Sequence, residues 1–138
     1  MKKVVLIACS SKKRSTESKA KDLYVSPLFV KSLSYAHKLQ PDLIFILSAK
    51  YGLIELDRKI EPYDITLKMM PAAHVKVWSN NVLTRLSRYT DLDKDHFIIL
   101  AGNLYRKHLI QRLRSYEIPL EGMTIGRQLQ HLKKQELA

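Results

Sequence analysis

Three short apolar runs constrain the fold of this chain more than any other feature. They cover residues 4–8, 43–47 and 97–101, and each is an unbroken stretch dominated by Val, Ile, Leu or Phe. A run of this length without alternating polar residues is typical of a strand that is covered on both faces. The three runs therefore predict the central strands of a parallel sheet.

Segments with helical periodicity separate and follow these runs. We expect helices over about residues 27–39, 72–89, 103–116 and 127–137. Ser26 stands before Pro27, an arrangement that favours a capping hydroxyl followed by a proline in the first turn. Strands alternating with helices form right-handed βαβ units, so the predicted fold is a three-layer α/β sandwich with a mostly parallel sheet flanked by helices.

The size and cysteine content limit the class of protein. With 138 residues the chain has the usual length of one domain, and we expect a single α/β domain over residues 1–138. The lone cysteine, Cys9, excludes an intramolecular disulfide or a thiolate metal cluster. The first apolar run is too short for a signal peptide or a membrane span. We therefore expect a cytoplasmic protein without a membrane partner.

The net charge of +11 predicts a polyanionic partner. The chain has 24 Lys and Arg residues against 13 Asp and Glu residues, so nucleic acid or a nucleotide is the leading candidate. The alternative is that the excess lysine only keeps a small protein soluble. The five histidines show no ligand spacing, so we expect neither a metal site nor a cofactor.

Ligands of parallel α/β sheets gather at the carboxyl ends of the strands, so the loops after the three runs are the candidate sites. The first loop contains Cys9, Ser10, Lys12, Lys13 and Arg14. These groups could hold phosphate, although the loop lacks the glycines of a nucleotide-binding motif. Clustered cations favour one neutral amine, and we predict Lys13 as a nucleophile. The alternative is a solvated basic loop beside a buried thiol.

The loop after the second run is locally acidic. Residues 53–64 contain four carboxylates and two cations, a local charge of −2 that favours a base or an amine over phosphate. Tyr51 or Tyr63 could stack on a planar base, and Glu61 or Asp64 could transfer a proton. Alternatively, these charges pair with nearby lysines and Tyr63 only packs.

The loop after the third run places Gly102 between a strand and the expected helix 103–116, where free N–H groups attract anions. Most such turns only connect two elements. The expected helix carries four cations beside its apolar side, at Arg106, Lys107, Arg112 and Arg114. This surface would suit a noncatalytic DNA- or RNA-binding module.

Several motifs resemble an uncharacterised family of small bacterial domains. They are CSSKK, AKDLYVSPLF, ILSAKYGL, IEPYDITL, LAGNLYRKHL and PLEGMTIGRQLQHLK, and they span nearly the whole chain. That family looks like a distant relative of the YaaA-like peroxide-stress proteins, which are associated with DNA binding. The resemblance implies a stress-related protein that acts near nucleic acid.

The first loop is also similar to the core domain of archaeosine synthase, an enzyme that acts on a deazaguanine base in transfer RNA. Cys9 and Lys13 match a motif in which a Lys stands four residues after a Cys. Tyr24 and Ser26 match its Tyr and Ser across an insertion, while Ala8 replaces its proline. The resemblance implies a uracil-DNA-glycosylase-like fold and a reactive Lys13.

These observations predict a nucleic-acid- or nucleobase-directed protein that could modify or release a base. The catalytic candidates are Lys13, Asp64 and Glu61. The substrate-binding candidates are Cys9, Ser10, Tyr24, Ser26, Lys50, Tyr51, Gly52, Tyr63 and Gly102. The nucleic-acid-binding candidates are Lys12, Arg14, Arg106, Lys107, Arg112 and Arg114. A noncatalytic stress-related module and a small-molecule nucleotide hydrolase or transferase are the alternatives.

Overall fold

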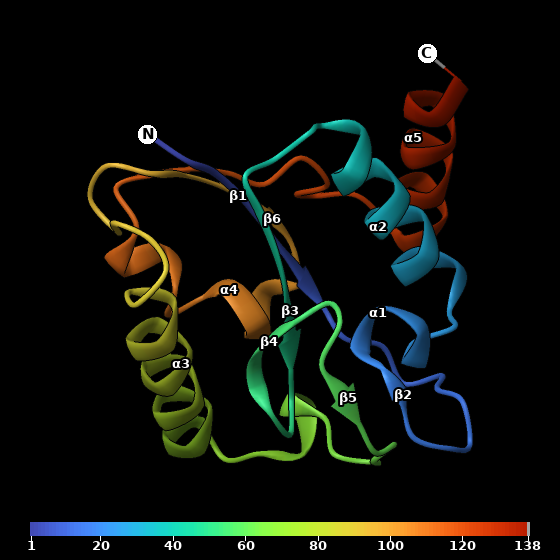
Figure 1. The fold of residues 1–138 in the computed structure, drawn as a ribbon, viewed down its shortest axis with the longest axis horizontal. Coiled ribbons are helices and arrows are strands. Elements are labelled where there is room, and N and C mark those ends of the chain that lie inside the picture. The colour runs from blue at the N-terminus through green and yellow to red at the C-terminus, as the bar shows by residue number, and fades with distance from the viewer. Residues whose placement is uncertain (138) are drawn as a thin grey trace.

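The computed structural model, which describes residues 1–137, contains a five-stranded sheet in the order β4-β3-β1-β6-β7 (Figure 1). The predicted central strands are β1 (Lys3–Ala8), β3 (Leu43–Ser48) and β6 (His96–Leu100). Both β3 and β6 pair in parallel with β1. The edge strand β7 (Ser115–Glu117) is parallel to β6, whereas the other edge strand, β4 (Gly52–Glu55), is antiparallel to β3.

Helices cover both faces of this sheet, so the predicted three-layer α/β sandwich is confirmed. On one face α2 (Pro27–Lys38) packs against α5 (Ile125–Leu137), and α3 (Ala72–Leu86) lies on the other side (Figure 1). The predicted start of α2 is confirmed, because the hydroxyl of Ser26 accepts a hydrogen bond from the N–H of Phe29 at 3.3 Å. No helix within residues 1–137 is long and apolar enough to cross a bilayer.

The segment after β1 forms a closed excursion between Lys13 and Tyr24, which pair in an isolated antiparallel bridge. The N–H of Arg14 donates to the carbonyl of Leu23 at 2.9 Å, and the N–H of Val25 donates to that of Lys12 at 3.0 Å. The two ends of the segment 14–23 therefore lie side by side at this bridge. The segment includes β2 (Ser18–Lys19) and α1 (Ala20–Leu23), and β2 pairs with β5 (Lys59–Ile60).

The predicted helix over residues 103–116 is wrong. The chain forms the single turn α4 (Asn103–Arg106), the 3-10 turn η2 (Ile110–Arg112) and then β7. Strand pairing explains the difference, because β7 satisfies its backbone groups against β6 in a register that places Ser115 opposite His96. Leu109 and Leu113 are buried as the periodicity requires, but the chain buries them by turning instead of continuing as a helix.

Carboxylates hold the amino-terminal edge of the sheet together. Asp95 accepts the N–H groups of Lys2 and Asp91, each at 2.7 Å, and Asp42 accepts the N–H of Lys3 at 2.7 Å. These bonds hold the pKa of Asp95 below its ordinary value, the bond from Lys2 being the largest cause. They anchor the start of β1 to the starts of its neighbours.

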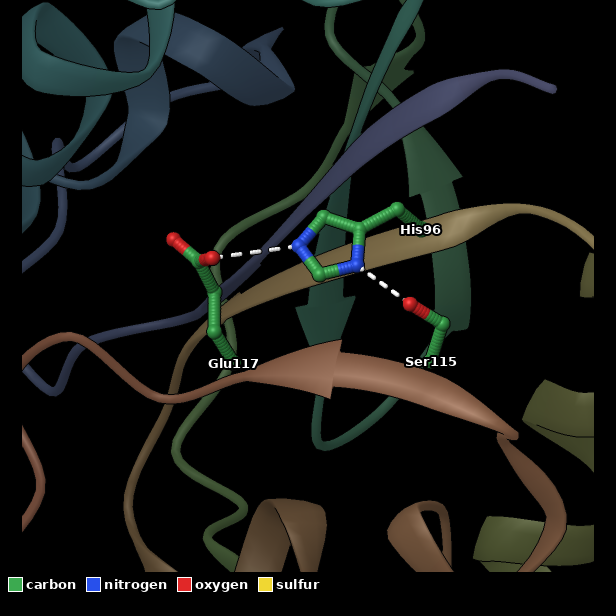
Figure 2. Close-up of polar contacts among 3 residues, drawn as sticks. All are labelled: His96, Ser115 and Glu117. Atoms are coloured by element: carbon green, nitrogen blue, oxygen red, sulfur yellow. Dashed lines mark hydrogen bonds and ion pairs between the residues drawn. The ribbon is translucent and has the colours of Figure 1, made fainter.

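A histidine joins the last two strands at this same edge (Figure 2). His96 Nδ1 lies 2.6 Å from the Oγ of Ser115, and His96 Nε2 lies 3.1 Å from a carboxylate oxygen of Glu117. Ser115 and Glu117 are two residues apart on β7, so they share one face of the strand. The arrangement fixes the short edge strand to β6.

Candidate functional site at the strand ends

The order of the strands defines where a ligand site is expected. From β1 the chain moves to β3 on one side, and later it crosses to β6 on the opposite side of β1. In open α/β sheets this reversal opens a crevice at the carboxyl ends of the two diverging strands. The switch point of this protein therefore lies between the ends of β1 and β6.

A cavity of about 430 Å³ opens at this switch point, and we call it the switch-point cavity. Its wall comes from the ends of β1 and β6, from α2 and α4, and from the segments around Lys68, Ile118, Leu120 and Gln128. The apolar part of the wall includes Phe29, Leu104 and Leu120. A cavity of this size can enclose a ligand as large as a nucleoside.

The polar side chains of the cavity wall are hydroxyls, amides, a thiol and cations. They belong to Cys9, Ser10, Ser26, Ser32, Lys68, Asn103, Tyr105, Arg106 and Gln128. No carboxylate of the described residues lines the cavity. The first and third predicted loops therefore meet in one basic pocket.

Arg106 is held in place by the backbone at the end of β6. Its Nη1 donates to the carbonyl of Ala101 at 2.7 Å, and its Nη2 lies 3.8 Å from the carboxylate of Glu121. The Arg106 side chain is 15 % exposed, whereas that of Glu121 is 65 % exposed. A long contact with an exposed carboxylate neutralises little of the charge, so Arg106 keeps most of its capacity to bind an anion.

Cys9 lies where the cavity meets a cluster of buried tyrosines. Its Sγ is 3.5 Å from the hydroxyl of Tyr105, and both residues line the cavity. Burial raises the pKa of Tyr105 above its ordinary value, and the neighbouring Cys9 adds to the shift. The phenol therefore stays protonated at neutral pH and can donate a hydrogen bond.

The tyrosine cluster is a chain of buried hydroxyls behind Cys9. The hydroxyl of Tyr63 lies 2.6 Å from that of Tyr24 and 2.8 Å from the Oγ of Ser48. Burial is the main cause that raises the pKa of Tyr24 to about 12 and that of Tyr63 further. The ring of Tyr24 lies 5.1 Å from that of Phe29, which lines the cavity, so the cluster adjoins the cavity.

Lys13 lies against this cluster and not in the cavity wall. Its Nζ is 4.4 Å from the ring centroid of Tyr63 and 5.8 Å from that of Tyr24, distances at which a cation interacts with an aromatic ring. The bridge between Lys13 and Tyr24 fixes the backbone on which the amine is carried. The half-buried Lys13 thus occupies a defined place against Tyr63 and Tyr24.

The structure brings together some of the predicted site residues. Cys9, Ser10, Ser26, Gly102 and Arg106 line the switch-point cavity. Lys13, Tyr24 and Tyr63 form the adjoining cluster, and the ring of Tyr51 packs edge-on against that of Tyr63 at 5.6 Å. The first loop, the tyrosines and the third loop therefore lie at the same end of the sheet.

Other predicted residues lie outside the cavity. Lys50 sits over the ring of Tyr51 at 5.3 Å, and Gly52 begins β4 with a positive φ of 73°. Glu61 and Asp64 are exposed and do not line the cavity. The exposed cations Lys12 and Arg14 belong to the first loop.

The predicted basic helix does not exist, and its four cations are separated. Arg106 lines the cavity, whereas Lys107, Arg112 and Arg114 are exposed in the segment that follows α4. This difference removes the continuous helical surface on which the noncatalytic binding module depended.

Sequence reasoning missed several residues of the site. Ser32 lies in the middle of α2, Lys68 lies in the turn η1 (Leu67–Met69), Tyr105 lies in α4, and Ser48 is the last residue of β3. A serine on the apolar face of α2, in line with Phe29 and Ala36, was the available signal for Ser32. The sequence holds no comparable signal for Lys68, because its position depends on contact between η1 and α4.

Comparison with known proteins gives a family but no activity. No curated protein matches the chain, and no solved structure does. The model of a family of unknown function (DUF6884) matches residues 4–134. That match covers nearly the whole sequence, and the chain therefore belongs to the DUF6884 family.

Proposed function

We propose that this protein is directed at nucleic acid or nucleobases and takes a base into the switch-point cavity, where it is modified or released. The observation that carries the proposal is the cavity itself. It lies where α/β sheets bind ligands, its wall is largely apolar, and its charged groups are all cationic. A nucleotide complements these features, because its planar base can pack on the apolar wall and its phosphate can bind the cations.

The exposed cations of the first loop would hold the phosphate backbone outside the cavity. Lys12 and Arg14 flank Lys13 and are solvent-exposed, and the whole chain carries a net charge of +11. A base that enters from a polymer must leave its stack, as it does in base-modifying enzymes. The resemblance to YaaA-like proteins agrees with a nucleic-acid partner of this kind.

The proposal extends to the first loop through the expected resemblance to the archaeosine synthase core domain. That motif has its Lys, Tyr and Ser close together, whereas here residues 14–23 intervene. The bridge between Lys13 and Tyr24 brings the two halves of the motif side by side, and Ser26 follows at the cavity wall. We therefore propose Lys13, which Tyr63 and Tyr24 position beside the cavity and not in its wall, as the amine that reacts with a ligand group extending beyond the cavity wall.

Blocking the cavity tests the binding proposal. Gly102 lines the cavity, its φ of −67° suits any residue, and an added Cβ would meet no atom within 4 Å. The Gly102→Phe variant should fold and fill part of the cavity. Gly126→Phe is the control, because Gly126 is also exposed and free of close neighbours but lies outside the cavity.

The measurement is calorimetric titration with free nucleobases, nucleosides and short single-stranded oligonucleotides. We expect the wild type and Gly126→Phe to bind at least one base or nucleoside, and Gly102→Phe to lose that binding by about tenfold or more. Equal binding by both variants would place the site elsewhere. Absence of any base or nucleoside binding by the wild type would refute the proposal.

The catalytic role of Lys13 has a matched control in Lys12. The protein is incubated with oligonucleotides and transfer RNA, and released or altered bases are measured by mass spectrometry. Turnover should disappear in Lys13→Ala and persist in Lys12→Ala, because both changes remove one charge but only Lys13 contacts Tyr63. Full turnover by Lys13→Ala would exclude its role as nucleophile.

A further inference from the structure

The charge distribution in the cavity wall indicates an anionic group on the ligand. The wall contains two formal cations, Lys68 and Arg106, and no carboxylate of the described residues. The two cations belong to different elements, η1 and α4, which contact each other at the side of the cavity. Two positive side chains beside one small cavity, with only the exposed carboxylate of Glu121 at 3.8 Å from Arg106, favour a doubly charged anion.

Arg106 is suited to bind that anion because it is oriented before the ligand arrives. Its bond to the carbonyl of Ala101 uses one part of the guanidinium, and the exposed Glu121 is 3.8 Å away. The remaining N–H donors can bind the oxygens of an anion in pairs. Lys68 is exposed, and its amine makes no hydrogen bond or ion pair with any described residue.

Ser32 provides an independent sign that the cavity takes a polar ligand. It is only 3 % exposed, it lines the cavity, and its hydroxyl makes no hydrogen bond with any described residue. No buried polar side-chain atom of the described residues lacks a hydrogen-bond partner, so solvent reaches the hydroxyl of Ser32 through the cavity. A ligand group that exchanges a hydrogen bond with Ser32 would replace that solvent contact.

We infer that the switch-point cavity binds a nucleoside monophosphate, with the phosphate at Arg106 and Lys68 and a polar edge of the base at Ser32. The inference rests on the proposed function and names its substrate class. A phosphate monoester carries a charge of about −2 at neutral pH, which matches the two cations. A phosphodiester inside a polymer carries one charge, so a free nucleotide or a terminal phosphate fits better than an internal one.

The test compares ligands that differ only in the phosphate. Nucleosides, their 5′- and 3′-monophosphates and the matching dinucleotide diesters are titrated against the wild-type protein by calorimetry. At least one monophosphate should bind about tenfold or more tightly than its nucleoside, as expected for charge-assisted hydrogen bonds. The diester should lie between them.

Charge-removing variants then locate the phosphate. Arg106→Gln and Lys68→Gln should each lower the affinity for the monophosphate by about tenfold and leave that for the nucleoside unchanged. Arg88→Gln, at an exposed arginine just beyond α3, is the control for the loss of net charge. Because Arg106 also bonds to the backbone, the thermal midpoint of each variant is measured, and the exposed Lys68 gives a second test that does not depend on folding.

Ser32→Ala tests the contact with the base independently of the phosphate site. It should weaken nucleoside and monophosphate by the same factor, about fivefold, because a neutral hydrogen bond is lost in both complexes. Equal affinities for nucleoside and monophosphate, or equal losses of both in Arg106→Gln, would overturn the phosphate site. Unchanged binding of both in Ser32→Ala would overturn the contact with the base.

Phenyl phosphate distinguishes failure of this inference from failure of the proposed function. If it binds in an Arg106-dependent manner while no nucleoside or nucleotide binds, the phosphate site stands and the nucleobase-directed function is refuted. If nucleosides bind in the cavity but Arg106→Gln and Lys68→Gln match Arg88→Gln for every ligand, the proposed function stands and the phosphate site is refuted.

Discussion

The two ends of the sheet use charged and polar groups in opposite ways. At the amino-terminal end Asp42 and Asp95 accept backbone N–H groups, and Glu117 lies in hydrogen-bond contact with His96. At the carboxyl-terminal end the cavity contains Arg106, Lys68 and the unpaired hydroxyl of Ser32. One end is closed by acidic groups that have partners, and the other is open and basic.

This difference separates stability from binding. A polar group with a good partner contributes to the free energy of folding, and its loss leaves the partner unsatisfied. A polar group that faces a cavity without a protein partner contributes little to folding and keeps its capacity to bind a ligand. Substitutions at the two ends should therefore change different properties of the protein.

Asp95→Asn should have the largest effect on stability. Asp95 is 5 % exposed and accepts two backbone hydrogen bonds, so we expect a loss of roughly 2 kcal/mol in the free energy of unfolding. Denaturant unfolding at neutral pH measures this loss. Nucleotide binding by the folded variant should stay unchanged, and a loss of binding without a loss of stability would contradict the comparison.

The same carboxylate predicts a dependence on pH. The pKa of Asp95 is lower in the folded chain than its ordinary value, so the carboxylate stabilises the fold above that ordinary value. This contribution should decrease below about pH 4 as the unfolded chain takes up its proton first. Asp95→Asn should lack that part of the pH dependence, whereas an unchanged profile would show that other groups cause it.

Tyr63→Phe tests whether the open end also contains a structural network. The change removes the hydroxyl of Tyr63, so the hydroxyls of Tyr24 and Ser48 each lose a hydrogen-bond partner. The free energy of unfolding should therefore fall by about 1 to 2 kcal/mol. Tyr51→Phe is the control, because its hydroxyl makes only a 3.4 Å contact at an exposed site. Equal effects of the two changes would argue against the buried chain of hydroxyls.

Ser115→Ala should have a smaller effect, of about 1 kcal/mol, because its bond to His96 is only partly buried. The line from serine to histidine to glutamate in Figure 2 also resembles the order of a hydrolytic relay. None of the three residues lines the switch-point cavity. We therefore expect the variant to retain nucleotide binding, and a specific loss of binding or turnover would refute a purely structural role.

Ser32→Ala should have the smallest effect on stability, although it affects the ligand. Removing an unpaired hydroxyl from the interior of a helix should leave the free energy of unfolding unchanged or raise it by about 0.5 kcal/mol, since Ala favours helix more than Ser. Thermal unfolding without ligand measures this. A loss of stability comparable to that of Asp95→Asn would show that Ser32 has a structural partner.

Local patterns in the sequence were sufficient to predict the central strands and the long helices. The apolar runs mark β1, β3 and β6, and Ser26 with Pro27 marks the start of α2. These signals work because a covered strand and an N-cap depend on residues that are adjacent in the chain. The edge strands β4 and β7 are too short for a periodic pattern: β4 is a four-residue strand in a hairpin with β3, and β7 is a three-residue strand that pairs with β6 across the intervening turns.

The candidate site was only partly predictable for the same reason. Cys9, Ser10 and Gly102 follow directly after strands, and their position at the carboxyl ends follows from the fold class. Ser32 and Lys68 approach the cavity from a helix and from a turn, so their roles depend on how these elements pack. The periodicity of residues 103–116 even favoured the wrong element, because spacing alone does not distinguish a helix from a turning chain.

The bridge between Lys13 and Tyr24 has a consequence for how this protein can vary. The residues on either side of the bridge are hydrogen-bonded to each other, and these bonds hold Lys13 and Tyr24 in place. The second half of the excursion belongs to the core, because Ala20 and Leu23 are buried and β2 pairs with β5, whereas its tip at residues 15–17 is exposed. We therefore expect insertions at this tip to have little effect on the geometry of the amine or the phenol, which makes it a suitable place for a tag or a reporter.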